Sequence, residues 1–346
     1  MYLRIFEGCN LHCDHCFIPS NPKMMKMGQF RDAANKIMEI TKPGDTVLVQ
    51  WHGGEPTAVP PRYFREAIGT LNSVLNDRVL VHGIQTNLIN YTEEWRDIFR
   101  EFFDSSIGVS WDYSIRKTKA GGKSNEDYEE RFWANFERLK ADGIQPYMVV
   151  TAAKSLFKGF SSPFDIINFL LSKGVEYVHF ERITKTGYAR ENWDKVGLNN
   201  REYSDYMSSL YRAYLLMNIN ANTRDKIHIS PFDGIRDSLV RLKNGGVGGY
   251  GCLSGACDTR FHTYDANGYK KGCTALTSEY DNKNANKESV VLFSDFAVAR
   301  KIRQLDCRSC DFKKICSSGC LASDKFDESK ECSGARGLFE AIRSFI

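Results

Sequence analysis

The chain lacks a hydrophobic run of the roughly 20 apolar residues that a membrane span requires. Its first residues, MYLRIFEGCN, also lack the basic head and long apolar core of a secretory signal. Neither sign of charge dominates, because 47 Lys and Arg stand against 43 Asp and Glu, a formal net charge of +4. We therefore expect a cytoplasmic protein with no membrane partner and no nucleic-acid partner.

Internal repeats and low-complexity tracts are absent as well. Hydrophobic residues make up 42% of the 346 residues and charged residues 26%, which excludes wholesale disorder and provides a sizeable core. A chain of this length forms two domains or one large domain with an appendage.

Up to about residue 215, short apolar runs alternate with longer amphipathic stretches. The short runs are rich in β-branched and aromatic residues, as buried parallel strands are. They predict strands at residues 2–6, 46–51, 79–85, 107–110, 147–151 and 177–181. Six strand–helix repeats indicate an α/β fold with a parallel sheet curled into a full or partial TIM-type barrel, and an open doubly wound sheet is the alternative.

The amino-acid composition changes after this region. Asn and Gly are frequent at residues 218–222 and 244–255, which is typical of a flexible connection. Beyond it, the turn sequence DANG at 265–268 predicts a β-hairpin. We therefore expect a first domain at residues 1–220, a linker at 221–251 and a second, smaller, cysteine-rich domain at 252–346.

Cysteine is unusually frequent, with 11 residues. Disulfides would leave one thiol over and would not persist in a reducing compartment. Cys9, Cys13 and Cys16 follow the first strand directly. Three thiolates so close together suit a [4Fe–4S] cube held at three corners, with one iron left open. The alternative is a zinc knuckle completed by His12 or His15.

This C-x3-C-x2-C spacing resembles the radical SAM superfamily, in which the open iron chelates S-adenosylmethionine. A second motif, Gly53-Gly54-Glu55-Pro56, follows the second strand. It matches the family's GGEP segment, which lies against the methionyl ammonium group of the cofactor. Paired glycines let the backbone approach a ligand closely. The resemblance implies a partial (β/α)6 barrel with its site at the carboxyl ends of the strands.

Other cofactor contacts follow from the same resemblance. Ser110, at the end of the fourth strand, matches the family's polar contact to the cofactor, and His15 stands where the family has an aromatic residue near the adenine. His52 and Glu181 end strands at the same edge and are candidate catalytic residues. Each of these four is also explained as an ordinary polar residue in a loop or at a strand end.

The remaining eight cysteines resemble the SPASM extension, which holds two auxiliary [4Fe–4S] clusters with four cysteines each. The resemblance assigns the nearer cluster to Cys252, Cys257, Cys273 and Cys320. It assigns the outer cluster to Cys307, Cys310, Cys316 and Cys332. With the first trio these sets use every cysteine. The competing interpretation is a double zinc site, because C-x2-C pairs are common zinc ligands.

The resemblance implies an oxidoreductase that cleaves S-adenosylmethionine reductively to a 5′-deoxyadenosyl radical, with an electron donor such as flavodoxin or ferredoxin. SPASM enzymes mostly modify peptides, so we expect a peptide substrate. The simplest modification is a crosslink in a ribosomally synthesised peptide. Because Cys9 lies near the start of this sequence and Cys332 near its end, we expect no leader-binding module in the chain, and hence a separate leader-binding protein or direct recognition of the core peptide.

Three alternatives stay open at this point. The first is a radical SAM dehydrogenase of a small-molecule alcohol or sugar. The second is a sulfatase-maturase-like enzyme, which Thr274 disfavours because that family has an aspartate after the cysteine and a neutral hydroxyl is a poor base. The third is a non-catalytic zinc or iron–sulfur protein that binds a partner.

Overall fold

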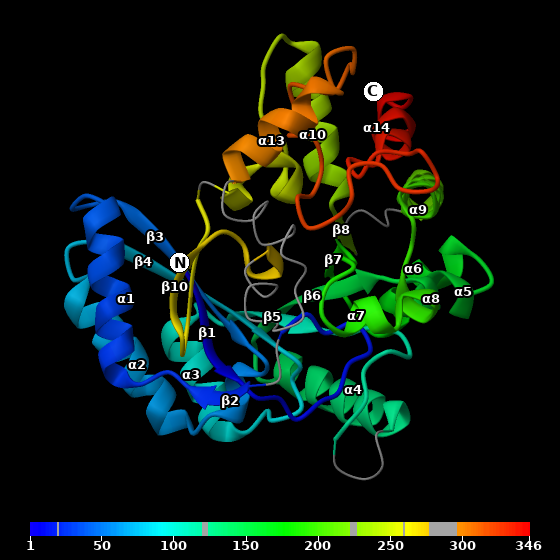
Figure 1. Ribbon diagram of the computed structural model, residues 1–346. Helices are drawn as coiled ribbons and strands as arrows, with labels where there is room; N and C mark the ends of the chain where they lie inside the picture. Colours follow the sequence, from blue (N-terminus) through cyan, green and yellow to red (C-terminus); the bar gives the residue numbers. More distant parts are fainter. Residues whose placement is uncertain (19–20, 120–123, 222–226, 259, 277–295) are drawn as a thin grey trace.

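A curved sheet of ten strands forms the centre of the computed structural model, which describes residues 1–18, 21–119, 124–221, 227–258, 260–276 and 296–346 (Figure 1). The strand order is β10-β9-β1-β3-β4-β5-β6-β7-β8, and β2 pairs with β1. The strands are β1 (Tyr2–Glu7), β2 (Asn21–Met24), β3 (Thr46–Gly53), β4 (Val79–Thr86), β5 (Ser106–Ser110), β6 (Gln145–Ala152), β7 (Tyr177–Arg182), β8 (His228–Ser230), β9 (His262–Asp265) and β10 (Gly268–Lys271).

Helices cover the outer side of this sheet and its carboxyl-terminal end (Figure 1). Helix α1 packs against α2, α2 against α3, and α14 against both α9 and α10. Their bounds are α1 (Met27–Ile40), η1 (Pro56–Ala58), α2 (Pro61–Val74), α3 (Glu93–Phe102), α4 (Asn125–Ala141), α5 (Lys154–Gly159), α6 (Pro163–Ser172), α7 (Tyr188–Glu191), α8 (Trp193–Val196), α9 (Asn200–Ala221), α10 (Phe232–Lys243), η3 (Gly251–Ser254), η4 (Ala256–Asp258), α13 (Phe296–Leu305) and α14 (Arg336–Arg343).

The six predicted strands are confirmed as β1, β3, β4, β5, β6 and β7, each within two residues of its predicted ends. Every pair in the run β1-β3-β4-β5-β6-β7-β8 is parallel. The run does not close, because β8 ends the sheet on one side and β10 ends it on the other. The α/β class with a partial TIM-type barrel is therefore confirmed, and the doubly wound alternative is wrong.

Side chains along each strand alternate between the helix-covered face of the sheet and the face that lines the barrel interior. In β6, Met148 and Val150 are buried under the helices, whereas Tyr147 and Thr151 point to the other side of the sheet. Successive side chains of a strand face opposite sides, so the second pair faces the interior. Because parallel strands have their carboxyl ends at one edge, the loops after the strands meet there.

The stretch expected as a linker contains regular structure. Strand β8 pairs in parallel with β7, and helix α10 follows it directly. The sequence signal for β8 is weak because the strand has three residues, of which only Ile229 is buried. Residues 228–243 of the expected linker therefore contain a strand and a helix, whereas 222–226 lie outside the described residues and the domain boundaries themselves stay a prediction.

The predicted hairpin is confirmed as β9 and β10, and it belongs to the barrel sheet. Strand β9 pairs in parallel with β1, so the second part of the chain extends the sheet of the first. Arg4, fully buried on β1, pairs with Glu7 and lies 3.4 Å from Asp265 of β9. These contacts fix the hairpin beside the strand that leads into the first cysteine loop.

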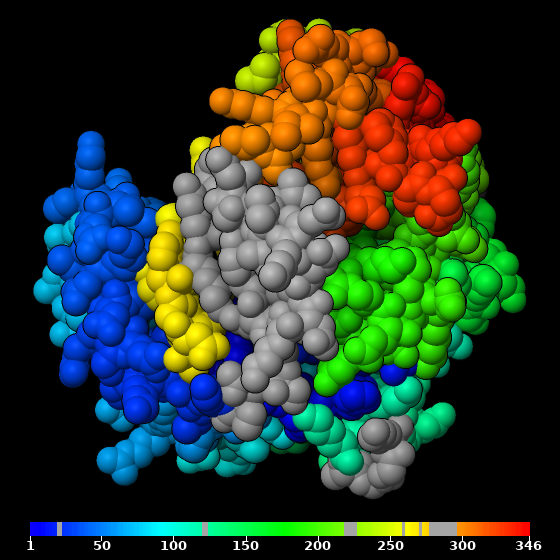
Figure 2. Space-filling view, viewed as in Figure 1, coloured from blue at the N-terminus to red at the C-terminus, as the bar shows by residue number. Residues whose placement is uncertain are grey.

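The carboxyl-terminal residues form the upper part of the face in Figure 2, drawn in orange and red. They are attached to the barrel by polar contacts as well as by helix packing. Arg182 at the end of β7 donates to Ser333 O at 2.7 Å, and Leu338 N donates to Ser204 Oγ at 3.2 Å. No helix in the described ranges is long and apolar enough to cross a membrane.

Candidate active site at the carboxyl ends of the strands

The first cysteine trio lies in the loop that leaves β1 at the carboxyl edge of the sheet. Backbone hydrogen bonds tie this loop to the segment after β5, from His12 N to Lys117 O at 2.8 Å and from Asp14 N to Ile115 O at 3.0 Å. On its other side, Tyr188 N donates to Cys16 O at 2.9 Å. The loop is therefore fixed from two directions by elements that are distant in sequence.

Ion pairs hold the same loop. The Asp14 carboxylate accepts from Lys117 Nζ at 3.0 Å and pairs with Lys195 of α8. Burial raises the pKa of Asp14, but the two ammonium groups outweigh it and hold the pKa below its ordinary value. Asp14 is therefore ionised near neutral pH and binds the cysteine loop to the helices beside it.

The three thiols share an electrostatic environment. Burial raises the pKa of Cys9 to about 12, and it raises the pKa values of Cys13 and Cys16 as well. The Arg116 guanidinium acts on all three in the opposite direction, lowering each pKa. Thiolates formed here would face the mostly buried Arg116 guanidinium, and Lys119 and Arg4 lower the pKa of Cys16 as well. The Cys9 sulfur also receives the backbone N–H of Leu11 at 3.3 Å.

The GGEP segment packs directly on the cysteine loop. Gly54 N donates to Phe6 O at 2.8 Å, and Glu55 N donates to Gly8 O at 3.0 Å. A Cβ atom on Gly54 would lie 2.2 Å from Gly8 O, and Gly53 has a φ of +145° with the same distance from its Cβ position to Phe6 O. Only glycine permits this approach.

The Glu55 carboxylate is almost completely buried and makes its contacts within the protein. Its Oε1 accepts from Thr57 N at 2.9 Å and from Thr86 Oγ1 at 2.7 Å, and its Oε2 accepts from Asn87 N at 2.7 Å. Asn87 in turn donates to Asn10 Oδ1 at 2.7 Å. Glu55 therefore positions the ends of β3 and β4 around the cysteine loop.

Ser110 and His15, predicted separately, each make a polar contact at or just after the end of β5. Ser110 Oγ accepts from Gln85 Nε2 at 2.7 Å. His15 Nε2 lies 3.2 Å from Asp112 Oδ2, whereas His15 Nδ1 is buried and has no hydrogen-bond partner among the described residues. If Nε2 carries the proton toward the carboxylate, Nδ1 is an acceptor that is open to a bound group.

Asp112 and Arg116 are the site residues that the sequence did not identify. Asp112 is fully buried and accepts from Arg116 Nε at 2.7 Å. Burial raises the Asp112 pKa, but Arg116 and then His15 outweigh this and bring it to about 2. The available signal was an aspartate directly after the strand-end sequence VSW, followed four residues later by an arginine.

All eleven cysteines lie in the described part of the chain, and none forms a disulfide. The eight later cysteines fall into two electrostatic sets. The charges of Cys257, Cys273 and Cys320 raise the pKa of Cys252, after the larger effects of Glu181 and burial. Behind the effect of burial, the pKa of Cys316 responds to Cys332, Cys307 and Cys310. Their membership coincides with the two sets of four that the resemblance assigns, and their role as cluster ligands stays a prediction.

Among the described residues, no three His, Cys, Asp or Glu side chains lie close enough to hold a single metal ion. A four-iron cube places its sulfur ligands at separate corners, further apart than the ligands of one ion. Thiols grouped in two sets, with an N–H donor on sulfur such as Arg300 Nη2 to Cys257 Sγ at 3.3 Å, fit iron–sulfur ligation.

His52 and Glu181 differ in their surroundings. His52 Nδ1 lies 3.1 Å from Gly53 O, and burial lowers the pKa of His52 to about 4, so the ring is neutral near pH 7. Glu181 is the largest influence on the pKa of Cys252, so its carboxylate lies beside the nearer set of four thiols. His179 Nε2 contacts it at 3.2 Å.

The match to known proteins agrees with this geometry. Residues 3–153 match the model of the Radical SAM superfamily. They contain the cysteine trio, the GGEP segment, Ser110 and the Asp112–Arg116 pair. This part of the chain therefore matches the family that the cysteine loop resembles, and the recognition made from that loop is confirmed.

Individual relatives show what the chain is similar to. It is 25% identical over 192 residues to the serine-type anaerobic sulfatase-maturating enzyme of Bacteroides thetaiotaomicron, an alignment that covers 51% of this chain and 44% of that enzyme. It thus spans less than half the length of this curated relative. An uncharacterized protein of Synechocystis is 31% identical over 132 residues, which is 34% of this chain and 32% of that protein.

Solved structures share the fold over nearly the whole chain. Native anSMEcpe with bound AdoMet and the Cp18Cys peptide aligns with a TM-score of 0.70 at 15% identity, covering 99% of this chain and 95% of that one. Streptococcus suis SuiB bound to its precursor peptide SuiA aligns with a TM-score of 0.58 at 14% identity, covering 93% of this chain and 71% of that one. At these identities the likeness concerns the fold.

Proposed function

We propose that this chain is a radical SAM enzyme of the SPASM type that cleaves S-adenosylmethionine reductively and oxidatively modifies a peptide side chain, most simply by forming a crosslink. The observation that carries the proposal is the division of the cysteines into one trio at the carboxyl edge of the barrel and two sets of four. The proposal includes three [4Fe–4S] clusters and an electron donor such as flavodoxin or ferredoxin.

Cys9, Cys13 and Cys16 would hold the first cluster, and Gly53 and Gly54 would face the cofactor beside it. When bound, the cluster and S-adenosylmethionine supply a 5′-deoxyadenosyl radical that can remove a hydrogen atom from an unactivated carbon. His15 Nδ1 offers the acceptor that the adenine amino group needs, and Asp112 holds the imidazole in place. Arg116 compensates the negative charge of the thiolates.

The peptide class is supported by the fold. Solved structures that share the fold include one with a bound Cp18Cys peptide and one with the precursor peptide SuiA. A sulfatase-maturase reaction is the second candidate, favoured by the identity to the Bacteroides enzyme. Against it, the residue after Cys273 is Thr274, whose buried hydroxyl is a poor base. Glu181 is the carboxylate beside the auxiliary thiols that can replace the missing aspartate.

Iron analysis after anaerobic reconstitution tests the cluster assignment. We expect about twelve irons per chain, which is the content of three four-iron clusters. Replacing Cys9, Cys13 and Cys16 by Ala should remove about four irons and abolish 5′-deoxyadenosine formation, whereas replacing the outer set should remove about four irons and leave some cofactor cleavage. Zinc in place of iron, or turnover in the trio variant, would contradict the proposal.

The substrate class needs its own experiment. A short peptide encoded beside this protein's gene is the candidate, and it should be co-expressed with the protein and analysed by mass spectrometry. Loss of two hydrogen atoms, about 2 Da, is the mass change of a crosslink, and a formylglycine gives a characteristic aldehyde product. Oxidation of an added alcohol or sugar, with no change in any peptide, would favour the small-molecule alternative.

A further inference from the structure

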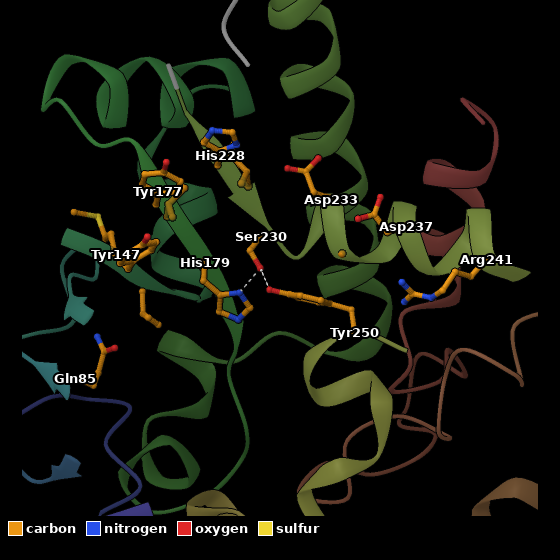
Figure 3. Close-up of a pocket in the computed structure, with 15 residues that line it drawn as sticks. Gln85, Tyr147, Tyr177, His179, His228, Ser230, Asp233, Asp237, Arg241 and Tyr250 are labelled. Atoms are coloured by element: carbon orange, nitrogen blue, oxygen red, sulfur yellow. Dashed lines mark hydrogen bonds between the residues drawn. The ribbon is translucent and has the colours of Figure 1, made fainter. Parts of the chain in front are cut away.

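A cavity of about 520 Å³ lies inside the barrel, against the interior faces of β6, β7 and β8 (Figure 3). Its size is that of a small-ligand or side-chain pocket. Helix α10 forms the opposite wall, and Tyr250, two residues before Cys252, closes it on the side of the second domain. None of these lining residues belongs to the trio or to the GGEP segment.

One wall of the cavity is a row of three rings on neighbouring strands. Tyr177 pairs in register with His228, and Tyr147 stands one strand further along at the same level. The ring centroids of Tyr147 and Tyr177 are 4.9 Å apart, and those of Tyr177 and His228 are 5.0 Å apart and stacked. Tyr147 is 46% exposed although it faces the barrel interior. The row thus presents aromatic surface that the described residues leave partly uncovered.

The wall opposite the rings carries negative charge. Asp233 and Asp237 are one helical turn apart on α10, and both line the cavity (Figure 3). Asp237 lies 3.9 Å from Arg236. Asp233 is half-buried, and its carboxylate has no salt-bridge or hydrogen-bond partner among the described residues. The cation at the rim, Arg241, donates to Ser238 Oγ at 3.0 Å.

The cavity reaches the predicted cofactor site through Gln85. This residue lines the cavity and donates from Nε2 to Ser110 Oγ, the predicted cofactor contact. Gly108, level with Gln85 on the next strand, makes this possible, because a Cβ atom there would lie 2.2 Å from Gln85 Oε1. A group bound in the cavity is therefore separated from the cofactor contact by one side chain.

We infer that this cavity binds a basic side chain, lysine or arginine, of the peptide substrate and so fixes the register of the neighbouring residue at the radical. The inference rests on the proposed peptide function. A long apolar stem fits along the ring row, and the rings attract a cation through their π-faces. Asp233 then supplies the counter-charge. A neutral aromatic side chain would fit the rings equally well but would leave Asp233 without a partner.

Selection from a display library of random peptides tests this, with the reconstituted protein kept anaerobic and saturated with S-adenosylmethionine. We expect lysine or arginine to be enriched at one position. A selected peptide should bind about five- to tenfold more tightly than its norleucine analogue, measured by fluorescence anisotropy. In Asp233→Asn this preference should disappear, and Asp233→Lys should select aspartate or glutamate instead.

The matched control is Asp205→Asn, which removes an exposed carboxylate of α9 that does not line the cavity. It should keep the full preference for the basic peptide. Peptides that bind without any preference for a basic residue, or a preference that survives Asp233→Asn, would overturn the inference while leaving the peptide function intact. A protein that cleaves S-adenosylmethionine but enriches no peptide would instead refute the peptide function, and the inference with it.

Discussion

Arg116 donates from Nε to Asp112 Oδ2 across 2.7 Å, and this pair is buried beside the first cysteine loop. Asp112 also accepts from Thr151 N on β6 and holds His15 Nε2 at 3.2 Å. The guanidinium is thereby fixed where its charge lowers the pKa values of Cys9, Cys13 and Cys16. One loop after β5 thus supplies the cation for the thiolates and the support for the imidazole.

Removing that cation should make the trio harder to ionise. In metal-free Arg116→Gln, the pKa values of Cys9 and Cys16 should rise further. At a fixed pH a smaller fraction of each thiol is then ionised, so both should react severalfold more slowly with iodoacetamide. Mass spectrometry of the labelled peptides gives the rate at each cysteine. Arg116→Lys should keep most of the rate.

Labelling of Cys307 serves as the internal control for that experiment. It lies in the outer set of four, outside the loop that Arg116 supports, and should react equally in all variants. An unchanged rate at Cys9 and Cys16 in Arg116→Gln would show that the guanidinium does not act on the trio.

Asp112 should make stability depend on pH in the acid range. Its folded-state pKa of about 2 lies below the ordinary 3.8, so the ionised carboxylate stabilises the fold above about pH 4 and this contribution is lost as the pH falls toward 2. This difference in pKa corresponds to about 2 kcal/mol of folding free energy. Asp112→Asn should therefore have a lower free energy of unfolding near pH 6, and the gap to the wild type should narrow near pH 3.

Urea unfolding at both pH values measures that gap. Asp97→Asn, which removes a half-exposed carboxylate on α3, should change the free energy of unfolding by less than about 0.5 kcal/mol at either pH. A constant gap for Asp112→Asn across the range would mean that its ionisation does not contribute.

Glu55 should stabilise the fold mainly through the hydrogen bonds that it accepts, and only slightly through its charge. Glu55→Ala leaves the buried N–H groups of Thr57 and Asn87 without their acceptor and should cost about 3 kcal/mol. Glu55→Gln keeps an oxygen for Thr57 and loses mainly the bond from Asn87, so about 1 kcal/mol is expected. Burial raises the pKa of Glu55, which agrees with a small benefit from its charge. Glu66→Ala on α2 is the exposed control, and equal losses in both Glu55 variants would contradict this role.

The strands were predictable because each one has a face that must be buried. In β3, Val47, Val49 and Trp51 are buried in alternation, a pattern that the sequence displays directly. Strand β8 was missed because three residues with one buried side chain carry no period. The parallel pairing of β9 with β1 was not predictable either, because a hairpin turn signal fixes only its own two strands.

The residues of the candidate site also differ in whether the sequence could predict them. The trio and the GGEP segment were found because each is continuous in sequence and resembles a known family. The buried Asp112–Arg116 pair was not, since a charged pair four residues apart in a loop has the same sequence appearance as a solvated one. That Cys252 lies beside Cys320 was taken from the resemblance, and the effect of Cys320 on the pKa of Cys252 now supports it physically.

The close approach of the GGEP segment to the cysteine loop yields the last prediction. In Gly54→Ala the new methyl group would lie 2.2 Å from Gly8 O, so the loop must move and the bond from Glu55 N to Gly8 O must break. Overpacking of this kind costs about 2 kcal/mol or more. Gly69→Ala is the matched control, because Gly69 lies within α2 with no atom within 4 Å of its Cβ position, and it should stabilise the protein by about 0.5–1 kcal/mol. The free energy of unfolding, measured in urea, and the rate of anaerobic 5′-deoxyadenosine formation should both fall in Gly54→Ala. Neither should fall in Gly69→Ala. If Gly54→Ala unfolded like the wild type, the contact between the two motifs would not be as tight as the backbone distances indicate.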